Sequence, residues 1–260
     1  MPLETGKIKL VREGPMAVLT LDNPPVNALR TDMLLEIGEW VAALEKEGAL
    51  VLIVTGAGNN AFCAGGDVSE MATIDPAAGS AIQRQGQDVL WRLEHSELIT
   101  LAAVNAFCAG GGLELALACD LRIAATNARF SAPEVNLGMI PGYGGTQRLP
   151  KTVGKAKAKE LILTAKTIRA DEALRLGLVN QVVPDGEELR AAKDVAMQIA
   201  SKAPLAVRAA KKAINEGWEK HYMNGFVAET RYFQGVLQSE DLKEGIRAFL
   251  EKRQAKWQGK

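Results

Sequence analysis

The sequence predicts an α/β fold with an at least partly parallel sheet, followed by a helical C-terminal region. Apolar, strand-like runs alternate with glycine-rich loops and helical segments through three cycles, which is typical of α/β proteins. From about Glu187 this alternation stops, and the remaining segments have an almost wholly helical pattern. We therefore expect two parts: an α/β core over residues 1–190, and a helical region over 191–260 that packs on the core or on another subunit.

The first cycle begins with two strands in residues 7–22, which meet at the turn Glu13-Gly14-Pro15. A stripe of apolar residues then predicts a helix over 31–47. Gly48 ends this helix, and the all-apolar run at 50–56 is typical of a strand buried in a parallel sheet.

The second and third cycles repeat the same order of elements. In chain order we expect a glycine-rich loop at 56–66, a helix at about 80–95, a strand at 99–107, a helix at 113–120, strands at 121–125 and 129–133, a glycine-rich loop at 138–145 and a helix at 155–164.

Charge and composition exclude several classes of function. The 31 basic residues balance 31 acidic ones, which argues against a nucleic-acid partner. The three cysteines show no CxxC spacing and only two histidines are present, so we expect no metal site and a reducing compartment. The uncharged run 98–113 is too short to span a membrane, and no targeting segment is visible. These features favour a cytoplasmic protein.

Common nucleotide and hydrolase motifs are absent or incomplete. Residues 56–61 loosely match a dinucleotide-binding fingerprint, but a loop follows them where that motif needs a helix. No phosphate-binding P-loop and no GxSxG nucleophile motif occurs. Basic clusters at 151–159 and 208–212 leave RNA binding open as a minor alternative.

Glu114 is the most informative residue of the sequence. It lies on the predicted helix GGLELALACD, which carries no lysine or arginine. A carboxyl group on an apolar helix loses hydration, and this raises its pKa. The alternatives are that Glu114 reaches solvent or caps a neighbouring strand.

Glu134 is a second candidate for acid–base chemistry. It follows Pro133 in the segment SAPEVNLGMIPGYGGTQ, whose glycines suit tight loops near a ligand. The helix from 113 and the returning strand near 129 could bring Glu114 and Glu134 together. Two carboxyl groups facing one ligand can divide the acid and base roles when their environments separate their pKa values. Alternatively, Glu134 is an exposed loop residue.

Two glycine-rich turns could supply backbone N–H donors. Gly110, Gly111 and Gly112 join a strand end to a helix start, where N–H groups have no partner within the helix. In the turn CAGGD at 63–67, Ala64 and the neighbouring glycines could expose another N–H group. Such donors suit an oxyanion, although both segments could be ordinary tight turns.

Six ordered motifs resemble the enoyl-CoA hydratase/isomerase (crotonase) family along nearly the whole chain. They are NPPVNAL (23–29), AFCAGGDVSEM (61–71), AVNAFCAGGGLELALACDLRIA (103–124), FSAPEVNLGMIPGYGGTQRLP (130–150), TAKTIRADEALRLGLVNQVVP (164–184) and FLEKRQAKW near the end.

The resemblance implies a fold, an assembly and a reaction. The fold would be a crotonase-like spiral of ββα repeats with a C-terminal helical trimerisation region, assembled as a homotrimer or a dimer of trimers. Hydratases of the family carry glutamates at the positions of Glu114 and Glu134, so the resemblance implies reversible hydration of a 2-enoyl-CoA to a 3-hydroxyacyl-CoA, as in fatty acid β-oxidation or 3-hydroxybutyryl-CoA dehydration. Coenzyme A would be part of the substrate, with no separate cofactor and no metal.

The resemblance also assigns roles to further residues. The N–H groups of Ala64 and Gly111 would form the oxyanion hole, and that of Gly142 would position the water. The expected CoA contacts are Pro25, Val26, Ala64, Gly65, Gly66, Asp67, Val68, Phe249 and Lys252. The main alternative is a specialised substrate, such as that of an enoyl-CoA isomerase or of a cyclic or dienoyl-CoA hydratase, because Tyr143 is a bulky residue in the PGYGG loop.

Overall fold

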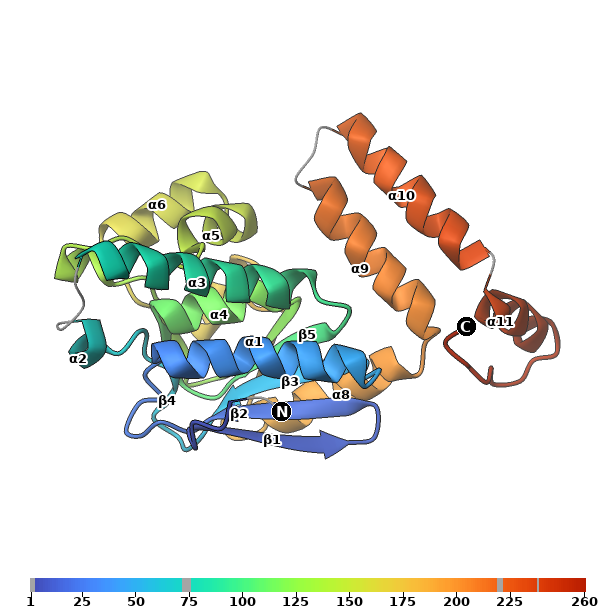
Figure 1. The fold of residues 1–260 in the computed structure, drawn as a ribbon, viewed down its shortest axis with the longest axis horizontal. Helices are drawn as coiled ribbons and strands as arrows, with labels where there is room; N and C mark the ends of the chain where they lie inside the picture. The colour runs from blue at the N-terminus through green and yellow to red at the C-terminus, as the bar shows by residue number, and fades with distance from the viewer. Residues whose placement is uncertain (1–2, 72–75, 219–221, 238) are drawn as a thin grey trace. The chain divides into compact units, whose positions relative to one another are not determined.

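The computed structural model describes residues 3–71, 76–218, 222–237 and 239–260. It divides into two compact units, the first ending at Asp194 and the second beginning at Val195 (Figure 1). The division falls within helix α8 (Glu188–Ala200). No described helix is long and apolar enough to cross a bilayer.

A six-stranded sheet forms the frame of the first unit. Its strands, in spatial order, are β1 (Ile8–Glu13), β2 (Met16–Leu21), β3 (Val51–Gly56), β5 (Ile99–Val104), β7 (Leu121–Ala125) and β10 (Gln181–Val183). The β1–β2 pair is antiparallel and every other pair is parallel. Every residue of β5 is buried, as is typical of a central strand in a parallel sheet. The predicted α/β class with a partly parallel sheet is confirmed.

A smaller sheet of four short strands carries the functional segments. Its order is β4 (Ala61–Cys63), β6 (Phe107–Ala109), β8 (Arg129–Ser131) and β9 (Ile168–Arg169). The β4–β6 and β6–β8 pairs are parallel. Each of the long strands β3, β5 and β7 is thus followed by a short strand of this second sheet, which gives the ββ part of the expected repeat.

The predicted strand at 99–107 and loop at 56–66 need correction. The apolar run 99–107 is divided between the two sheets, ending β5 at Val104 and beginning β6 at Phe107. Between them, the side-chain amide of Asn105 donates to the carbonyl of Gly58 at 2.8 Å and to that of Ala61 at 3.3 Å. These bonds tie the crossing point to the 56–66 segment, which contains β4.

Helices cover the sheets of the first unit. They are α1 (Thr31–Lys46), α2 (Val68–Met71), α3 (Pro76–His95), α4 (Gly111–Ala118), α5 (Gly145–Val153), α6 (Lys155–Leu163) and α7 (Ala170–Arg175), with a 3₁₀ turn η1 at Glu134–Leu137. Helices α1 and α3 pack side by side (Figure 1). The sequence prediction missed α5, which begins among glycines and contains Pro150.

Helix α4 is buried along its whole length. At its C-terminal end, the guanidinium of Arg122 donates to the carbonyls of Ala116 at 3.2 Å and Cys119 at 2.6 Å, which adds hydrogen bonds to carbonyls at the end of the helix. At its N-terminal end, a Cβ on Gly112 would lie 2.2 Å from the carbonyl oxygen of Cys63. Glycine is therefore required there for α4 to approach the end of β4.

The second unit is helical, as predicted for this part of the sequence. It contains the end of α8 and helices α9 (Pro204–Trp218), α10 (Tyr222–Leu237) and α11 (Glu240–Leu250). Helices α9 and α10 pack against each other. The C-terminal segment is fastened within the unit, because the carboxylate of Asp241 accepts the N–H groups of Gln258 and Gly259 at 2.6 and 2.9 Å.

Candidate active site

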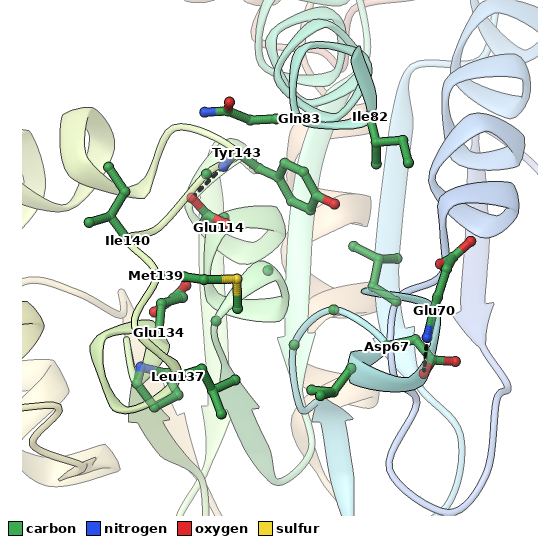
Figure 2. A pocket seen from close by; sticks show the side chains of 18 of the residues that line it. Asp67, Glu70, Ile82, Gln83, Glu114, Glu134, Leu137, Met139, Ile140 and Tyr143 are labelled. Atoms are coloured by element: carbon green, nitrogen blue, oxygen red, sulfur yellow. Dashed lines mark hydrogen bonds between the residues drawn. The ribbon is translucent and has the colours of Figure 1, made fainter. Parts of the chain in front are cut away.

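A cavity of about 650 Å³ lies in the first unit, at the edge where the short strands end. Three segments form most of its wall: the 64–70 segment after β4, the start of α4 after β6, and the 133–143 segment after β8. Ile82 and Gln83 of α3 complete it (Figure 2). Because β4, β6 and β8 are parallel neighbours, their carboxyl ends meet at one edge, which is where α/β sheets usually bind ligands.

Glu114 reaches this cavity from the first turn of α4. The residue is only 3% exposed. Its Oε1 accepts the backbone N–H groups of Tyr143 and Gly145, both at 2.7 Å (Figure 2 shows the first of these bonds). Both bonds fall on Oε1, so Oε2 is the oxygen left for a bound molecule. Because the side chain is buried, the alternative prediction that Glu114 reaches solvent is wrong.

The protonation of Glu114 is set mainly by burial. The pKa of Glu114 is raised to about 7, mainly by loss of hydration and to a smaller extent by the nearby carboxylate of Glu134. The N–H groups of Gly145 and Tyr143 and the charge of Arg148 act in the opposite direction. A carboxyl group with a pKa near neutrality can accept and return a proton at physiological pH.

Glu134 enters the same cavity from the opposite side, at the start of η1. Figure 2 shows its side chain below that of Glu114. Its Oε2 is buried and has no hydrogen-bond partner among the described residues. Burial raises the pKa of Glu134 as well. The structure thus brings the two predicted glutamates together at one cavity.

The pairing of β6 with β8 explains why the two glutamates meet. Gly110 follows β6, and its N–H donates to the carbonyl of Ser131 at the end of β8. Gly110 has a φ of +51°, and a Cβ there would lie 3.5 Å from Oε1 of Glu134. A glycine thus allows the chain to turn into α4 next to the Glu134 carboxylate.

The expected N–H donor at Ala64 needs correction. The Ala64 N–H already donates to the carbonyl of Val26 at 3.1 Å, so it is not free for a ligand. The next candidate in this turn is Gly66, because a Cβ built on Gly111 would lie 3.5 Å from the Gly66 nitrogen. Within the described residues, no hydrogen bond occupies the Gly66 N–H. Gly66 and Gly111 therefore offer the adjacent pair of donors.

The 141–145 segment contributes to the site in a way that the sequence prediction missed. Gly142 lines the cavity as expected, and its carbonyl accepts the side-chain amide of Gln87 at 3.0 Å. The N–H groups of Tyr143 and Gly145 fix Glu114, a role for which the sequence had suggested no residue. The only available signal was the run PGYGG, because backbone donors leave no trace in side-chain identity.

The expected CoA contacts in the segment 64–68 lie at the cavity. Gly65, Gly66, Asp67 and Val68 line it together with Ala64. Asp67 caps α2 by accepting the N–H of Ser69 at 2.9 Å, and it receives a hydrogen bond from Arg30 at 3.2 Å.

The other expected contacts lie elsewhere. Pro25 and Val26 are exposed outside the cavity wall, and Val26 is joined to it through its carbonyl bond with Ala64. Lys252 lies exposed in the second unit. The side chain of Phe249 lies outside the described residues.

The described residues contain no group of three or more metal-ligating side chains. None of the three cysteines forms a disulfide, and all three are buried. Burial raises the pKa of the Cys63 thiol to about 12, so this residue is a protonated core side chain and no nucleophile. The chemistry offered by the site is therefore that of two carboxyl groups and backbone donors.

Comparisons with known proteins agree with this geometry. Residues 12–260 match the family model described as enoyl-CoA hydratase/isomerase. The chain is 44% identical to the short-chain-enoyl-CoA hydratase of Clostridium acetobutylicum, covering 96% of this chain and 97% of the relative. It is 46% identical to the crotonyl-CoA hydratase of Syntrophomonas wolfei, covering 95% and 96%.

Solved structures agree with these matches. An enoyl-CoA hydratase from Bacillus anthracis superposes with a TM-score of 0.94 at 37% identity, covering 98% of this chain and all of that one. The expected crotonase-like fold is confirmed by this match. The chain belongs to the enoyl-CoA hydratase/isomerase family.

Proposed function

We propose that this chain is an enoyl-CoA hydratase, which adds water reversibly across the 2,3 double bond of a 2-enoyl-CoA to give a 3-hydroxyacyl-CoA. The observation that carries the proposal is the pair of carboxyl groups, Glu114 and Glu134, that face one cavity beside two backbone donors. The names of the similar proteins from Clostridium acetobutylicum and Syntrophomonas wolfei support the same reaction.

The thioester oxygen lies between the N–H groups of Gly66 and Gly111. Donors at this position stabilise the negative charge that develops on the oxygen when C3 is attacked, and each is typically worth about 3–4 kcal/mol in the transition state. Gly111 is at the first turn of α4, where the N–H groups have no intrahelical partner and the helix dipole is positive. This pair replaces the expected pair of Ala64 and Gly111.

The two glutamates divide the proton transfers. Glu114, held through Oε1, uses Oε2 to take a proton from water as the water oxygen bonds to C3. Glu134 gives its proton to C2, whose electron pair comes from the C2–C3 double bond. The Gly142 N–H holds the water. One turnover leaves the proton on Glu114, so a proton must pass back to Glu134 before the next. Each role contributes on the order of 10²–10⁴ in rate.

The assembly and surroundings are part of the same proposal. Coenzyme A is carried by the substrate, and no further cofactor takes part. The second unit mediates a homotrimer or a dimer of trimers, which is supported by apolar side chains exposed on α9 and α10, such as Trp218 at 70% and Phe233 at 62%. Three cysteines without a disulfide suit a reducing compartment such as the cytoplasm. Sedimentation of the purified protein measures the oligomeric state.

The test is the loss of the enoyl-thioester absorbance of crotonyl-CoA with the wild type, Glu114→Gln and Glu134→Gln. Hydration by the wild type and a loss of roughly 10²-fold or more in kcat for each variant are expected. Calorimetric binding of butyryl-CoA to each variant shows that the site is intact. A wild type that binds butyryl-CoA but leaves crotonyl-CoA unchanged would contradict hydration of simple enoyl groups. It would instead favour a specialised acyl group or an isomerisation.

A further inference from the structure

We propose that the aromatic ring of Tyr143 limits the length of the acyl chain that the cavity accepts, so that the protein selects short acyl thioesters. This inference rests on the proposed function, and it names the substrate class of that same site. Its basis is the position of the ring between two helices that flank the reacting groups.

The ring of Tyr143 fills the gap between α3 and the start of α4. A Cβ on Gly86 of α3 would lie 2.3 Å from Cδ1 and from Cε1, which form one edge of the ring. A Cβ on Gly111 of α4 would lie 3.5 Å from Cδ2 and from Cε2, on the opposite edge. Each helix therefore has a glycine where it lies next to the ring. Figure 2 shows the ring projecting into the cavity beside Ile82.

The backbone of Tyr143 is held at both of its polar atoms. Its N–H donates to Glu114 at 2.7 Å, and its carbonyl accepts the guanidinium of Arg148 at 2.8 Å. Arg148 is itself paired with Glu94 of α3 at 2.8 Å. With the backbone fixed and a helix against each edge, the ring has little freedom to swing away from a bound chain.

The position of the ring determines which part of a substrate meets it. The thioester oxygen lies at Gly111 and the reacting carbons lie between Glu114 and Glu134, so the ring borders the acyl group next to C2 and C3. An acyl chain that continues toward α3 beyond these carbons meets the ring. The other route runs past Met139 and Ile140, which are 39% and 67% exposed. Methylene groups there stay partly in water and gain less from binding.

Binding of saturated acyl-CoA tests the inference without requiring turnover. Butyryl-CoA and decanoyl-CoA are titrated calorimetrically into the wild type, Tyr143→Ala and Tyr143→Phe. We expect the wild type to favour butyryl-CoA. In Tyr143→Ala, affinity for decanoyl-CoA relative to butyryl-CoA should rise at least tenfold, since each methylene moved out of water is worth about fourfold in Kd. The Tyr143→Phe variant keeps the ring and should keep the wild-type ratio.

A double-mutant cycle provides a second test that does not depend on the Ala variant alone. Gly86→Ala places a methyl group where the ring edge now lies, which pushes the ring into the cavity. We expect butyryl-CoA to bind at least threefold more weakly to Gly86→Ala. The same substitution should have no such effect in a Tyr143→Ala background, because the ring is gone.

The outcomes separate this inference from the proposed function. An unchanged ratio in Tyr143→Ala, or a wild type that binds decanoyl-CoA as tightly as butyryl-CoA, overturns the role of the ring. Equal effects of Gly86→Ala in both backgrounds overturn it too. Crotonyl-CoA hydration by the same preparations reports on the function separately. A protein that selects by chain length but does not hydrate crotonyl-CoA contradicts only the function.

Discussion

Glu114 and Glu134 face one cavity, but the chain supports them differently. Glu114 lies in a buried helix, and one of its carboxylate oxygens accepts two backbone N–H groups at 2.7 Å. Glu134 begins a four-residue 3₁₀ turn in which no residue is fully buried, and one of its oxygens has no partner among the described residues. The first carboxyl group is held in one geometry by two backbone donors, whereas Oε2 of the second has no such donor among the described residues.

This difference suggests how two residues of the same type perform different tasks. A fixed carboxylate with a pKa near 7 suits a base that must aim at one water molecule. A partly exposed carboxyl group with an unsatisfied oxygen suits an acid that must recover its proton after each turnover. Four experiments test this difference between the two glutamates.

The largest expected effect is on turnover when both glutamates are replaced. Each single Gln variant should lose on the order of 10²–10⁴ in kcat. Because both act on one substrate in one reaction, the double variant Glu114→Gln/Glu134→Gln should lose far less than the product of the two single losses. The hydration rate of crotonyl-CoA measures this. Fully multiplicative losses would show that the two groups act independently.

The second effect is the pH dependence of kcat/KM. Burial raises the pKa of Glu114 to about 7, and hydration requires its carboxylate. The rate should therefore fall at low pH, where Glu114 is protonated, and fall again at high pH, where Glu134 has lost the proton that it must give to C2. A rate constant that is flat from pH 5.5 to 8 would contradict the role of Glu114 as the base. Glu134→Gln should keep this acid limb, at a much lower rate.

The role of Glu114 could be predicted from the sequence because it depends only on the neighbouring residues of one helix. A glutamate among leucines and alanines on a helix is desolvated wherever that helix is buried, and the structure shows a helix buried throughout. The parallel order of the long strands could also be predicted, since β3 and β5 are largely apolar.

The sequence predictions were wrong at positions where backbone geometry, and not side-chain type, determines the structure. The sequence suggested Ala64 as a donor, yet its N–H is paired with Val26, whereas the Gly66 N–H in that turn has no partner among the described residues. Nor could periodicity divide the run 99–107 between two sheets, because both parts are equally apolar. The side-chain bonds of Asn105 that mark the crossing point depend on a segment more than 40 residues away in sequence.

The third effect is on stability. The pKa of Glu114 is about 7 in the folded protein against an ordinary 4.5, so folding favours the protonated form. The resulting stabilisation is complete below about pH 4.5 and is lost as pH rises through 7, where the buried charge costs about 3 kcal/mol. Glu114→Gln should therefore raise the free energy of unfolding at pH 8 by up to about 3 kcal/mol, with no gain at pH 4.

Chemical denaturation at the two pH values measures this change. Glu134→Gln is the matched control. Its carboxyl group is only partly buried, so its gain at pH 8 should be smaller in the same direction. If the free energy of unfolding at pH 8 rose equally in the two variants, the two carboxyl groups would not differ in how strongly they are buried.

The smallest effect on stability and rate is expected from two separate variants, each of which adds one methyl group near one of the two glutamates. In Gly145→Ala, the new Cβ would lie 2.9 Å from Oε1 of Glu114 and 2.9 Å from Pro141, so the rigid support must shift at a cost of about 1–3 kcal/mol. In Gly138→Ala, the new Cβ meets no heavy atom within 4 Å, but a φ of +72° is unfavourable for alanine by about 1 kcal/mol.

The hydration rate distinguishes the two variants beyond their stability. Gly145→Ala displaces the carboxylate that must aim at water, so kcat should fall about tenfold or more, since misplacement of a catalytic group by a fraction of an ångström weakens catalysis. Gly138→Ala strains only the end of the short turn, and Glu134 can adjust, so kcat should change less than threefold. If Gly138→Ala is as damaging as Gly145→Ala in folded protein, Glu134 requires as rigid a support as Glu114 does.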